Sequence, residues 1–453
     1  MAGLFPAAGG RCHLLDAGAG IGSLSGAFLE RCMGKAFDFD GIKLTAFELD
    51  ENLHAELHGS LRGYADKLTF SLEIAGGDFI EAAINRIQFG QSNFTHAILN
   101  PPYRKIKSNS RCRLLLRQVG IETVNLYSAF VALSLFLVIP GGQVVAIVPR
   151  SFCNGPYYRF FRDFMLKHAA VRHIHLFESR NKTFRDDGVL QENIIIRLER
   201  DGEQGPVTVS TSTDDTFADF AARVHPFTQI VIPTDQEQFI HVPVSLRKSA
   251  IEASPSIRYS LNDIGINVST GPVVDFRLKE HLRDMPETGT VPLLYAGHFT
   301  DRGMIWPQAG IKKPNAICRN SDTEKWLYPN GFYCVVRRFS SKEEKRRIMA
   351  SVVNSAAFNG APMLGFENHL NLFHQNRRGL SQTLARGLAV FLNTTAVDEY
   401  FRCFSGHTQV NATDLKLMKY PSRETLIELG KWAMQYRKIT QAMVDDKLET
   451  LDV

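Results

Sequence analysis

The chain has 453 residues, 44% of them hydrophobic, which is enough for about two to three globular domains. It contains no apolar run of about 18 residues and no basic segment followed by an apolar stretch at its start. These absences exclude a membrane-spanning helix and a visible secretory signal, so we expect a cytoplasmic protein with no membrane partner. The net charge of +5 permits a polyanionic partner, and seven scattered cysteines without paired spacing predict no metal site.

Short apolar runs alternate with helical patterns over the first 200 residues, which is typical of a mostly parallel sheet covered on both faces. The last two predicted strands are expected to pair antiparallel across the long segment 178–191. We predict strands over residues 13–16, 43–47, 68–74, 96–99, 143–148, 171–177 and 193–198. We predict helices over residues 23–32, 51–64, 80–87, 122–138 and 157–167.

The rest of the chain divides into a connecting region and a second domain. Residues 201–258 are polar and contain several prolines, so we interpret them as a connection. From residue 259 onward aromatic and basic residues alternate with turns. Three more helices are predicted there, over residues 380–392, 397–404 and 424–451.

A glycine-rich loop follows the first predicted strand and opens the first helix. Gly18 and Gly20 allow a ligand to approach the backbone closely, beside the free N–H groups of a helix start. Asp16 precedes them and would repel the pyrophosphate of a dinucleotide. The same carboxylate suits the ammonium and sulfonium side of S-adenosylmethionine, directly or through water.

Acidic residues also follow the second and third strands. Glu48 is suited to accept both hydroxyls of a ribose. Asp50 competes for that role, but we rank it lower because it suits the cap of the helix over 51–64. Asp78 is suited to accept from an adenine amino group, with helix capping as its alternative role. Phe79 is suited to pack on the adenine face.

The fourth strand ends in Asn-Pro-Pro-Tyr, which is the most informative motif of the chain. Pro101 and Pro102 stop the strand because neither donates to a sheet ladder. Asn100 then offers a side-chain acceptor at the sheet edge, the Pro101 carbonyl offers a second one, and Tyr103 adds a flat ring. This set suits an exocyclic amino group on a planar base. The alternative is a strand followed by an ordinary Pro-Pro turn.

Two basic segments favour a phosphate-bearing substrate, although a solvated surface is the alternative reading of each. The first directly follows Tyr103, and the second lies within residues 301–350. The candidate contacts are Arg104, Lys105, Lys107 and Arg111 in the first, and Lys312, Lys313, Arg337 and Arg338 in the second.

In this order the motifs resemble the N6-adenine DNA methyltransferases of type II restriction–modification systems, in their gamma group. The resemblance rests on the glycine loop with Asp16, on Glu48, on Asp78-Phe79 and on Asn100 to Tyr103. Four further stretches are similar to the subgroup of XhoI-type modification enzymes, namely residues 120–127, 148–155, 268–276 and 406–411.

The resemblance implies an α/β fold of the S-adenosylmethionine-dependent, Rossmann-like type, with a mostly parallel seven-stranded sheet over residues 1–200. It implies a mixed α+β target-recognition domain over 259–453. A further cofactor-binding segment normally precedes the glycine loop. Residues 2–6 look like its tail, so we expect weakened cofactor binding in an N-terminally short chain.

The resemblance also implies roles for the site residues. Asn100 and the Pro101 carbonyl would hold the amino group of an adenine flipped out of duplex DNA, and Tyr103 would stack on it. Phe184 is predicted to cover the other face of the base, with Phe177 as the alternative. A cognate restriction endonuclease is implied as a functional partner that does not bind the chain, and a monomer is expected.

Other activities compete with this interpretation. RNA and protein-glutamine methyltransferases share Asn-Pro-Pro-Tyr, and a truncated remnant would bind DNA without catalysis. N4-cytosine enzymes usually carry Ser in place of Asn100, so adenine is preferred. The chain has no cysteine nucleophile in a Pro-Cys loop, and no acid-acid-lysine cluster that indicates a fused nuclease.

Overall fold

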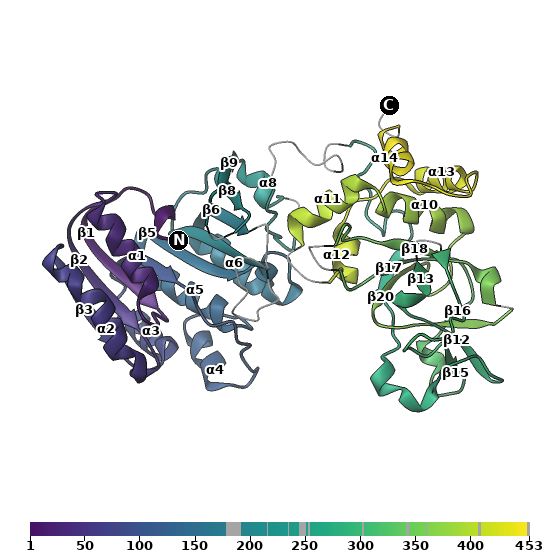
Figure 1. The fold of residues 1–453 in the computed structure, drawn as a ribbon, viewed down its shortest axis with the longest axis horizontal. Helices are drawn as coiled ribbons and strands as arrows, with labels where there is room; N and C mark the ends of the chain where they lie inside the picture. Colours follow the sequence, from purple (N-terminus) through teal and green to yellow (C-terminus); the bar gives the residue numbers. More distant parts are fainter. Residues whose placement is uncertain are drawn as a thin grey trace. The chain divides into compact units, whose positions relative to one another are not determined.

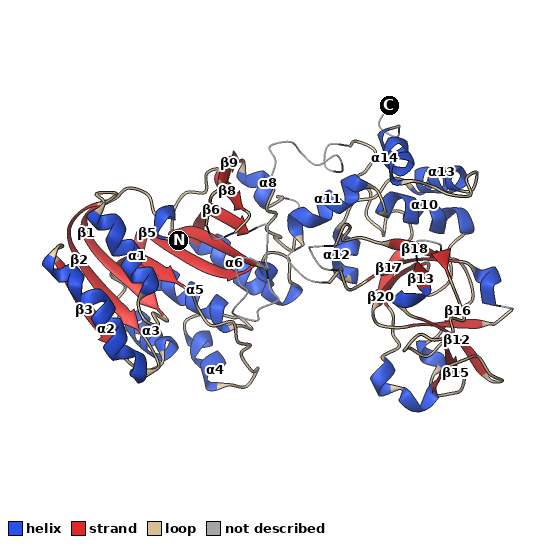
Figure 2. Ribbon diagram, viewed as in Figure 1, coloured by secondary structure: helices blue, strands red, loops and turns tan. Residues whose placement is uncertain are grey.

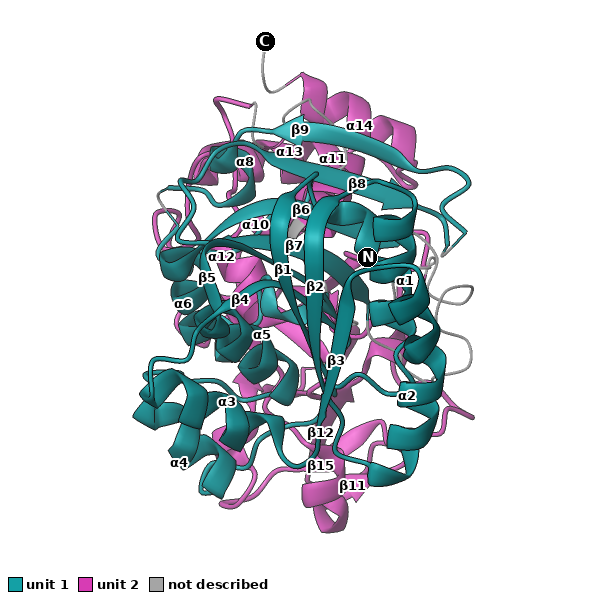
Figure 3. Cartoon of the chain, turned by 90° about the vertical axis from the view of Figure 1, so that its left-hand side faces the viewer, with its two compact units in different colours: residues 1–246 teal, residues 247–453 magenta. Residues whose placement is uncertain are grey.

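The computed structural model divides into two compact units, Met1–Leu246 and Arg247–Val453, which are coloured separately in Figure 3. Each unit has hydrophobic clusters of its own. The structure describes residues 1–177, 192–214, 216–233, 235–243, 251, 254–300, 303–340, 344–358, 360–405 and 409–450.

Unit 1 is built on one mixed sheet of nine strands in the order β3-β2-β1-β4-β5-β7-β6-β8-β9 (Figure 1). Neighbouring strands from β3 to β5 are parallel, as are β6 and β8. β7 pairs antiparallel with β5 and β6, and β9 with β8. The strands are β1 (Gly9–Ala17), β2 (Asp38–Phe47), β3 (Phe70–Ala75), β4 (Phe94–Leu99), β5 (Val138–Pro149), β6 (Ala169–Phe177), β7 (Asn193–Arg200), β8 (Val207–Ser212) and β9 (Ala221–His225).

All seven predicted strands are present, and the antiparallel pairing of the last two is confirmed. The expected count of seven is wrong, because β8 and β9 extend the sheet from within the stretch that was expected to connect two domains. The sequence of β8 looks polar, yet Ser210 and Ser212 are buried. Their hydroxyl groups hydrogen-bond to the ring of His175 on β6, so the sheet accommodates them.

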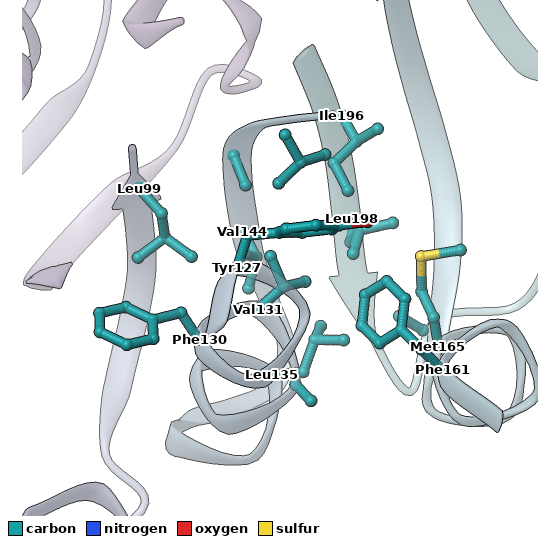
Figure 4. Packing of buried hydrophobic residues seen from close by; sticks show 14 of the residues in the cluster. Leu99, Tyr127, Phe130, Val131, Leu135, Val144, Phe161, Met165, Ile196 and Leu198 are labelled. Carbon is teal, nitrogen blue, oxygen red and sulfur yellow. The ribbon is translucent and has the colours of Figure 1, made fainter. Parts of the chain in front are cut away.

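Helices cover both faces of this sheet (Figure 3). α1 (Ser23–Met33) and α2 (His54–Arg62) pack on one face, and α3 (Phe79–Gln88), α5 (Leu126–Leu137) and α6 (Arg159–His168) pack on the other. In Figure 4, Tyr127, Val131 and Leu135 of α5 lie against Val144 and Leu198 of the sheet. α4 (Arg111–Gln118) and α8 (Phe227–Ile230) complete the unit.

Unit 2 contains small sheets and a group of helices (Figure 2). One sheet has the order β10-β20-β17-β18 and another the order β11-β15-β12-β19-β16. Its strands are β10 (Asn267–Thr270), β11 (Leu282–Arg283), β12 (Thr290–Leu294), β13 (Phe299–Thr300), β14 (Gly303–Met304), β15 (Ala316–Cys318), β16 (Tyr328–Pro329), β17 (Tyr333–Arg337), β18 (Ala350–Val353), β19 (Met363–Phe366) and β20 (Leu370–His374).

The helices of unit 2 are α10 (Gln382–Leu392), α11 (Thr395–Phe404), α12 (Ala412–Leu417), α13 (Arg423–Ala433) and α14 (Gln441–Glu449). The expected single helix over 424–451 is therefore two helices. The second begins at Gln441, and the side chain of Thr440 caps it by accepting from the Met443 N–H. None of the helices in the described parts of either unit is long and apolar enough to cross a membrane.

Candidate active site

The site lies where four neighbouring strands of unit 1 end. Ala17, at the end of β1, pairs in register with Phe47 of β2, and Phe47 pairs with Ala75 of β3. On the other side Asp16 pairs with Ile98 of β4. The residues that follow these strands therefore meet at one edge of the sheet, which is where open α/β folds bind ligands.

The glycine loop is folded against the end of β2. Gly18 and Ala19 both donate their N–H groups to the Phe47 carbonyl, at 2.9 Å each. Gly18 and Gly20 have φ values of 84° and 55°, which side chains with a Cβ rarely adopt. A Cβ added to Gly20 would meet no atom within 4 Å, so the space beside that residue is open.

Glu48 holds this loop in place with its carboxylate. Its Oε2 accepts from the Gly20 N–H at 2.8 Å, and its Oε1 accepts from the Asp50 N–H at 2.9 Å. Each oxygen keeps acceptor capacity for a ribose hydroxyl. Asp50 itself caps the 3-10 helix Glu51–Leu53 by accepting from the Asn52 N–H at 3.0 Å, so the preference for Asp50 as a cap is confirmed.

Asp16 is completely buried beneath the loop. The Ser25 hydroxyl donates to Asp16 Oδ2 at 2.6 Å, while Oδ1 is buried without a hydrogen-bond partner among the described residues. Burial raises the pKa of Asp16 to about 7, because a carboxylate loses its hydration there. An unpaired buried acceptor next to an open glycine loop fits the ammonium group of S-adenosylmethionine, reached directly or through one water.

Asp78 and Phe79 both have structural roles at the start of α3. Asp78 is exposed and caps α3, since its Oδ1 accepts from the Ile80 N–H at 2.7 Å. The Phe79 ring is only 4% exposed, and its centroid lies 5.2 Å from Phe47 and 4.8 Å from Phe130. Phe79 therefore belongs to the core and offers little surface to an adenine.

Asn100 is exposed directly after the buried end of β4. A Cβ built on Gly18 would lie 3.9 Å from the Asn100 carbonyl oxygen, so the glycine loop and the Asn-Pro-Pro-Tyr segment are neighbours. Pro101 is buried and Pro102 is exposed. Tyr103 is half-buried, with its hydroxyl donating to the Ile147 carbonyl at 3.4 Å. The structure thus places Asn100 beside the predicted cofactor loop.

The segment after Tyr103 is hydrogen-bonded to the residues at the start of α5. Ile106 donates to the Val124 carbonyl and Leu126 donates to the Arg104 carbonyl, both at 2.8 Å. Between these two bonds the buried Asn125 side chain donates to the Tyr158 hydroxyl. These backbone bonds hold the chain immediately after Tyr103 in one position.

Two neighbours of the site were missed by the sequence analysis. Ser25 supplies the hydroxyl that binds Asp16, and a serine in the first turn after the glycine loop was the available signal. A ring atom of Phe130 would lie 4.0 Å from a Cβ on Gly18. The sequence gives no signal for Phe130, because it is one of many apolar residues in α5.

The predicted second aromatic, Phe184, lies outside the described residues. Its alternative, Phe177, is 5% exposed and packs edge-on against His175, with ring centroids 4.7 Å apart. Phe177 is therefore a core residue at the end of β6.

The predicted DNA contacts have different surroundings. Arg104, Lys105, Lys107 and Lys312 are exposed. Arg111 is exposed and pairs with Glu81 at 3.1 Å, whereas Lys313 pairs with Asp275 at 2.6 Å. Arg337 pairs with Glu344, and Arg338 donates to the Asn368 carbonyl at 3.3 Å. Among the described residues, no group of three or more His, Cys, Asp or Glu is placed to hold a metal ion.

Comparisons with known proteins match the chain to methylases and methyltransferases. The family model described as Eco57I restriction-modification methylase matches residues 44–184. The type II methyltransferase M.BsuBI of Bacillus subtilis is 52% identical over 446 residues, which are 97% of this chain and 88% of that protein. The type II methyltransferase M.PstI of Providencia stuartii is 40% identical, covering 98% of this chain and 89% of that protein.

Solved structures show a similar fold at low sequence identity. The type IIL restriction-modification enzyme MmeI, in complex with DNA, matches with a TM-score of 0.53 and 10% identity, covering 95% of this chain and 66% of that one. The type ISP restriction-modification enzyme LlaGI, bound to a DNA substrate mimic, matches with a TM-score of 0.52 and 12% identity, covering 94% of this chain and 51% of that one.

Proposed function

Since this chain belongs to the type II methyltransferases of restriction–modification systems, we propose that it transfers a methyl group from S-adenosylmethionine to N6 of adenine in duplex DNA. The observation that carries the proposal is the position of Asn100. This exposed carboxamide follows β4 directly, and its backbone lies beside Gly18 of the predicted cofactor loop.

Asn100 Oδ1 and the Pro101 carbonyl are the proposed acceptors for the two hydrogens of the target amino group. The lone pair of that nitrogen is delocalised into the ring, so it is a poor nucleophile. Two acceptors favour a more tetrahedral nitrogen and stabilise the positive charge that develops on it, which is electrostatic preorganisation. Bound S-adenosylmethionine supplies an activated methyl group on a sulfonium. The chain's own contribution is to align the nitrogen with it.

We propose that three groups bind the cofactor. They are Asp16 Oδ1, which has no hydrogen-bond partner among the described residues, the loop at Gly18 and Gly20, and the Glu48 carboxylate. Asp78 is proposed to accept a hydrogen bond from the adenine amino group of the cofactor, with the carboxylate oxygen that does not cap α3. Phe79 is proposed to contact the same adenine of the cofactor. Because its side chain is buried, this contact is the weakest of the proposed cofactor contacts.

The target base has to leave the duplex before Asn100 can reach it, and base flipping costs about a few kcal/mol. Stacking on Tyr103 offsets about 1–3 kcal/mol of this. The Tyr103 hydroxyl bond to Ile147 orients its ring in advance. Phe184 remains our prediction for the opposite face of the base.

Two relatives described as type II methyltransferases, matched over 97% and 98% of this chain, support DNA as the substrate over RNA or protein glutamine. We retain adenine over cytosine because Asn stands at position 100. We retain the XhoI-type subgroup on the sequence of the four stretches 120–127, 148–155, 268–276 and 406–411. A restriction endonuclease that cuts the same site is the proposed functional partner, and the working unit is proposed to be a monomer.

The test is methyl transfer by wild type and Asn100→Ala from radiolabelled S-adenosylmethionine to unmodified DNA. Wild type is expected to produce N6-methyladenine, identified by mass spectrometry of the nucleosides. Asn100→Ala should reduce kcat by at least 100-fold (about 3 kcal/mol), because one of two charge-stabilising acceptors is lost. Cofactor binding by calorimetry and DNA binding by gel shift should persist.

Asn93→Ala is the matched control, since Asn93 is an exposed asparagine just before the amino end of β4. It should keep full activity. N4-methylcytosine as the product, or undiminished turnover by Asn100→Ala, would refute the proposal. Absence of cofactor binding by wild type would favour an inactive DNA-binding remnant.

A further inference from the structure

Unit 2 contains a cavity of about 320 Å³ that the proposed chemistry does not use. Its walls come from residues 261–262 and 266–269, from the end of β20 with the turn that follows it, and from Lys416 of α12. The volume is in the range of about 300–1,000 Å³ that is typical of small-ligand sites. None of its lining residues corresponds to a predicted DNA contact.

The charge of this cavity is positive. Arg377 and Lys416 are exposed cations on its rim, and the described residues that line it include no Asp or Glu. His374 is buried, and burial together with the nearby Arg377 lowers its pKa, so its ring is neutral near pH 7. The cavity therefore presents two positive charges to a ligand.

Arg377 is held in a fixed position. Its guanidinium donates to the Lys325 carbonyl at 3.0 Å and lies 4.5 Å from the centroid of the Tyr328 ring. Side chains of the cavity wall also fix its backbone, since the Arg377 N–H donates to His374 Nδ1 at 3.1 Å. The neutral His374 ring then carries its proton on Nε2 and donates to Ser269 Oγ at 2.8 Å.

The turn that carries Arg377 has an uncommon backbone. Gln375 and Arg378 exchange two hydrogen bonds of 2.9 and 2.8 Å, and between them Asn376 and Arg377 have φ values of 48° and 62°. The second central position of such a hairpin turn favours glycine. A long cationic side chain in a left-handed conformation is sterically unfavourable, and strain of this kind is concentrated at functional sites.

The accessible lining of the cavity is mainly polar. Leu261 and Ile266 lie behind it and are buried, and Val268 is a half-buried apolar side chain of its wall. The exposed Asn262 and Asn267 add carboxamide groups at the rim. Two cations with amide donors beside them match a phosphate, because its oxygens need charged and polar hydrogen-bond donors.

We propose that this cavity binds one phosphodiester of the DNA backbone, with its phosphate oxygens on Lys416 and Arg377. The inference rests on the proposed DNA substrate. Phosphate contacts of this kind fix the register of a protein on a duplex without reading its sequence. Lys416 and Arg377 are thus assigned to affinity, and not to the methylation step.

The test compares Lys416→Gln with Lys419→Gln, a control that removes another exposed lysine three residues along the chain which does not line the cavity. Affinity for a labelled 20-base-pair duplex is measured by fluorescence anisotropy between 50 and 200 mM KCl. A lost phosphate contact lowers the slope of log K against log salt by about one. We expect this from Lys416→Gln, with a loss of affinity of about fivefold or more, and a smaller change from Lys419→Gln.

Further measurements separate the outcomes. Methyl transfer at saturating DNA should keep its kcat in Lys416→Gln. Inorganic phosphate should compete with duplex binding more weakly in Lys416→Gln than in Lys419→Gln. The proposal is wrong if Lys416→Gln leaves the slope of log K against log salt unchanged. It is also wrong if both variants lower that slope equally. If Lys416→Gln loses phosphate binding but keeps the salt slope of wild type, the cavity binds free phosphate and not DNA, which also contradicts the proposal.

Failure of the site and failure of the proposed function give different results. A wild-type protein that methylates DNA while Lys416→Gln keeps the full salt slope refutes only the cavity. A wild-type protein that binds duplex DNA through Lys416 but transfers no methyl group refutes only the enzymatic proposal. Arg377→Gln with Arg378→Gln as its control repeats the comparison on the turn, and a thermal melt of each variant checks folding.

Discussion

Asp16 combines burial, an unpaired oxygen and a pKa raised from 3.8 to about 7. In the free protein this carboxylate is therefore close to half-protonated at neutral pH. A cation placed at Oδ1 would favour the charged form, so the unfavourable burial of Asp16 is consistent with a role in binding. The carboxylate and its place before the glycines are visible in the sequence, but its burial depends on α1, whose Ser25 hydroxyl binds it.

The Asp16 pKa has a consequence for stability. Between pH 4 and pH 7 the unfolded chain loses the Asp16 proton while the folded protein keeps it, so the free energy of unfolding falls as the pH rises through this window. Asp16→Asn removes this loss. We expect the stability of Asp16→Asn relative to wild type to increase by about 3 kcal/mol from pH 5 to pH 8, measured by thermal melts without cofactor.

Asp66→Asn is the control, because Asp66 is exposed. It should leave the pH dependence of unfolding as in wild type. Asp16→Asn should also bind S-adenosylmethionine more weakly in calorimetry. An equal difference from wild type at pH 5 and pH 8 would contradict the assigned burial of Asp16.

At the scale of elements, periodicity predicted the interior of each helix and strand better than its ends. α1 and the strands up to β5 lie where the apolar pattern placed them, and their ends move by a few residues. The helix expected over 122–138 begins at Leu126, because the Val124 carbonyl accepts from the Ile106 N–H in the segment after Asn-Pro-Pro-Tyr. α4 was missed, since its basic residues were interpreted only as a charged run.

The crossing of α10 and α13 depends on two glycines. A Cβ on Gly387 would lie 1.7 Å from the Leu426 carbonyl oxygen, and one on Gly430 would lie 1.8 Å from the Thr383 carbonyl oxygen. Backbone atoms cannot be moved aside as a flexible side chain can. The two helices therefore approach as closely as they do because neither residue has a side chain.

Gly387→Ala should destabilise unit 2 by at least about 1–3 kcal/mol, as other overpacked cores are destabilised. Thermal unfolding followed by circular dichroism measures the effect. The control is Gly59→Ala in α2, where an added Cβ meets no atom within 4 Å. That substitution should stabilise its helix by about 0.5–1 kcal/mol. Unaltered melting of Gly387→Ala would show that the two helices do not cross at these glycines.

At the scale of the whole molecule, the chain has two units with separate cores. The clusters around α5 and α1 belong to residues 1–246, and those around α10 and the sheets of β20 and β12 belong to residues 247–453. The proposed cofactor site lies entirely in unit 1. The proposed phosphate cavity lies entirely in unit 2. Each unit is thus expected to respond to its own ligand.

Scanning calorimetry of the full chain should resolve two unfolding transitions, because each unit has its own core. Saturating S-adenosylmethionine should raise the unit 1 transition, by about 2.7 kcal/mol of stability at 100 times Kd. Gly387→Ala should lower only the other transition, which identifies it as unit 2. A single transition that shifts with both changes would contradict independent units.

The sequence by itself determined the order of the motifs, because acids, glycines and Asn-Pro-Pro-Tyr each follow a strand with a local pattern of its own. It also determined the main strands and helices of unit 1, which depend on short-range periodicity. Only the tertiary structure decided that β8 and β9 join the sheet, that Asp16 is buried and that Arg377 and Lys416 meet at one cavity. These features depend on contacts between residues far apart in the chain, and no local pattern encodes them.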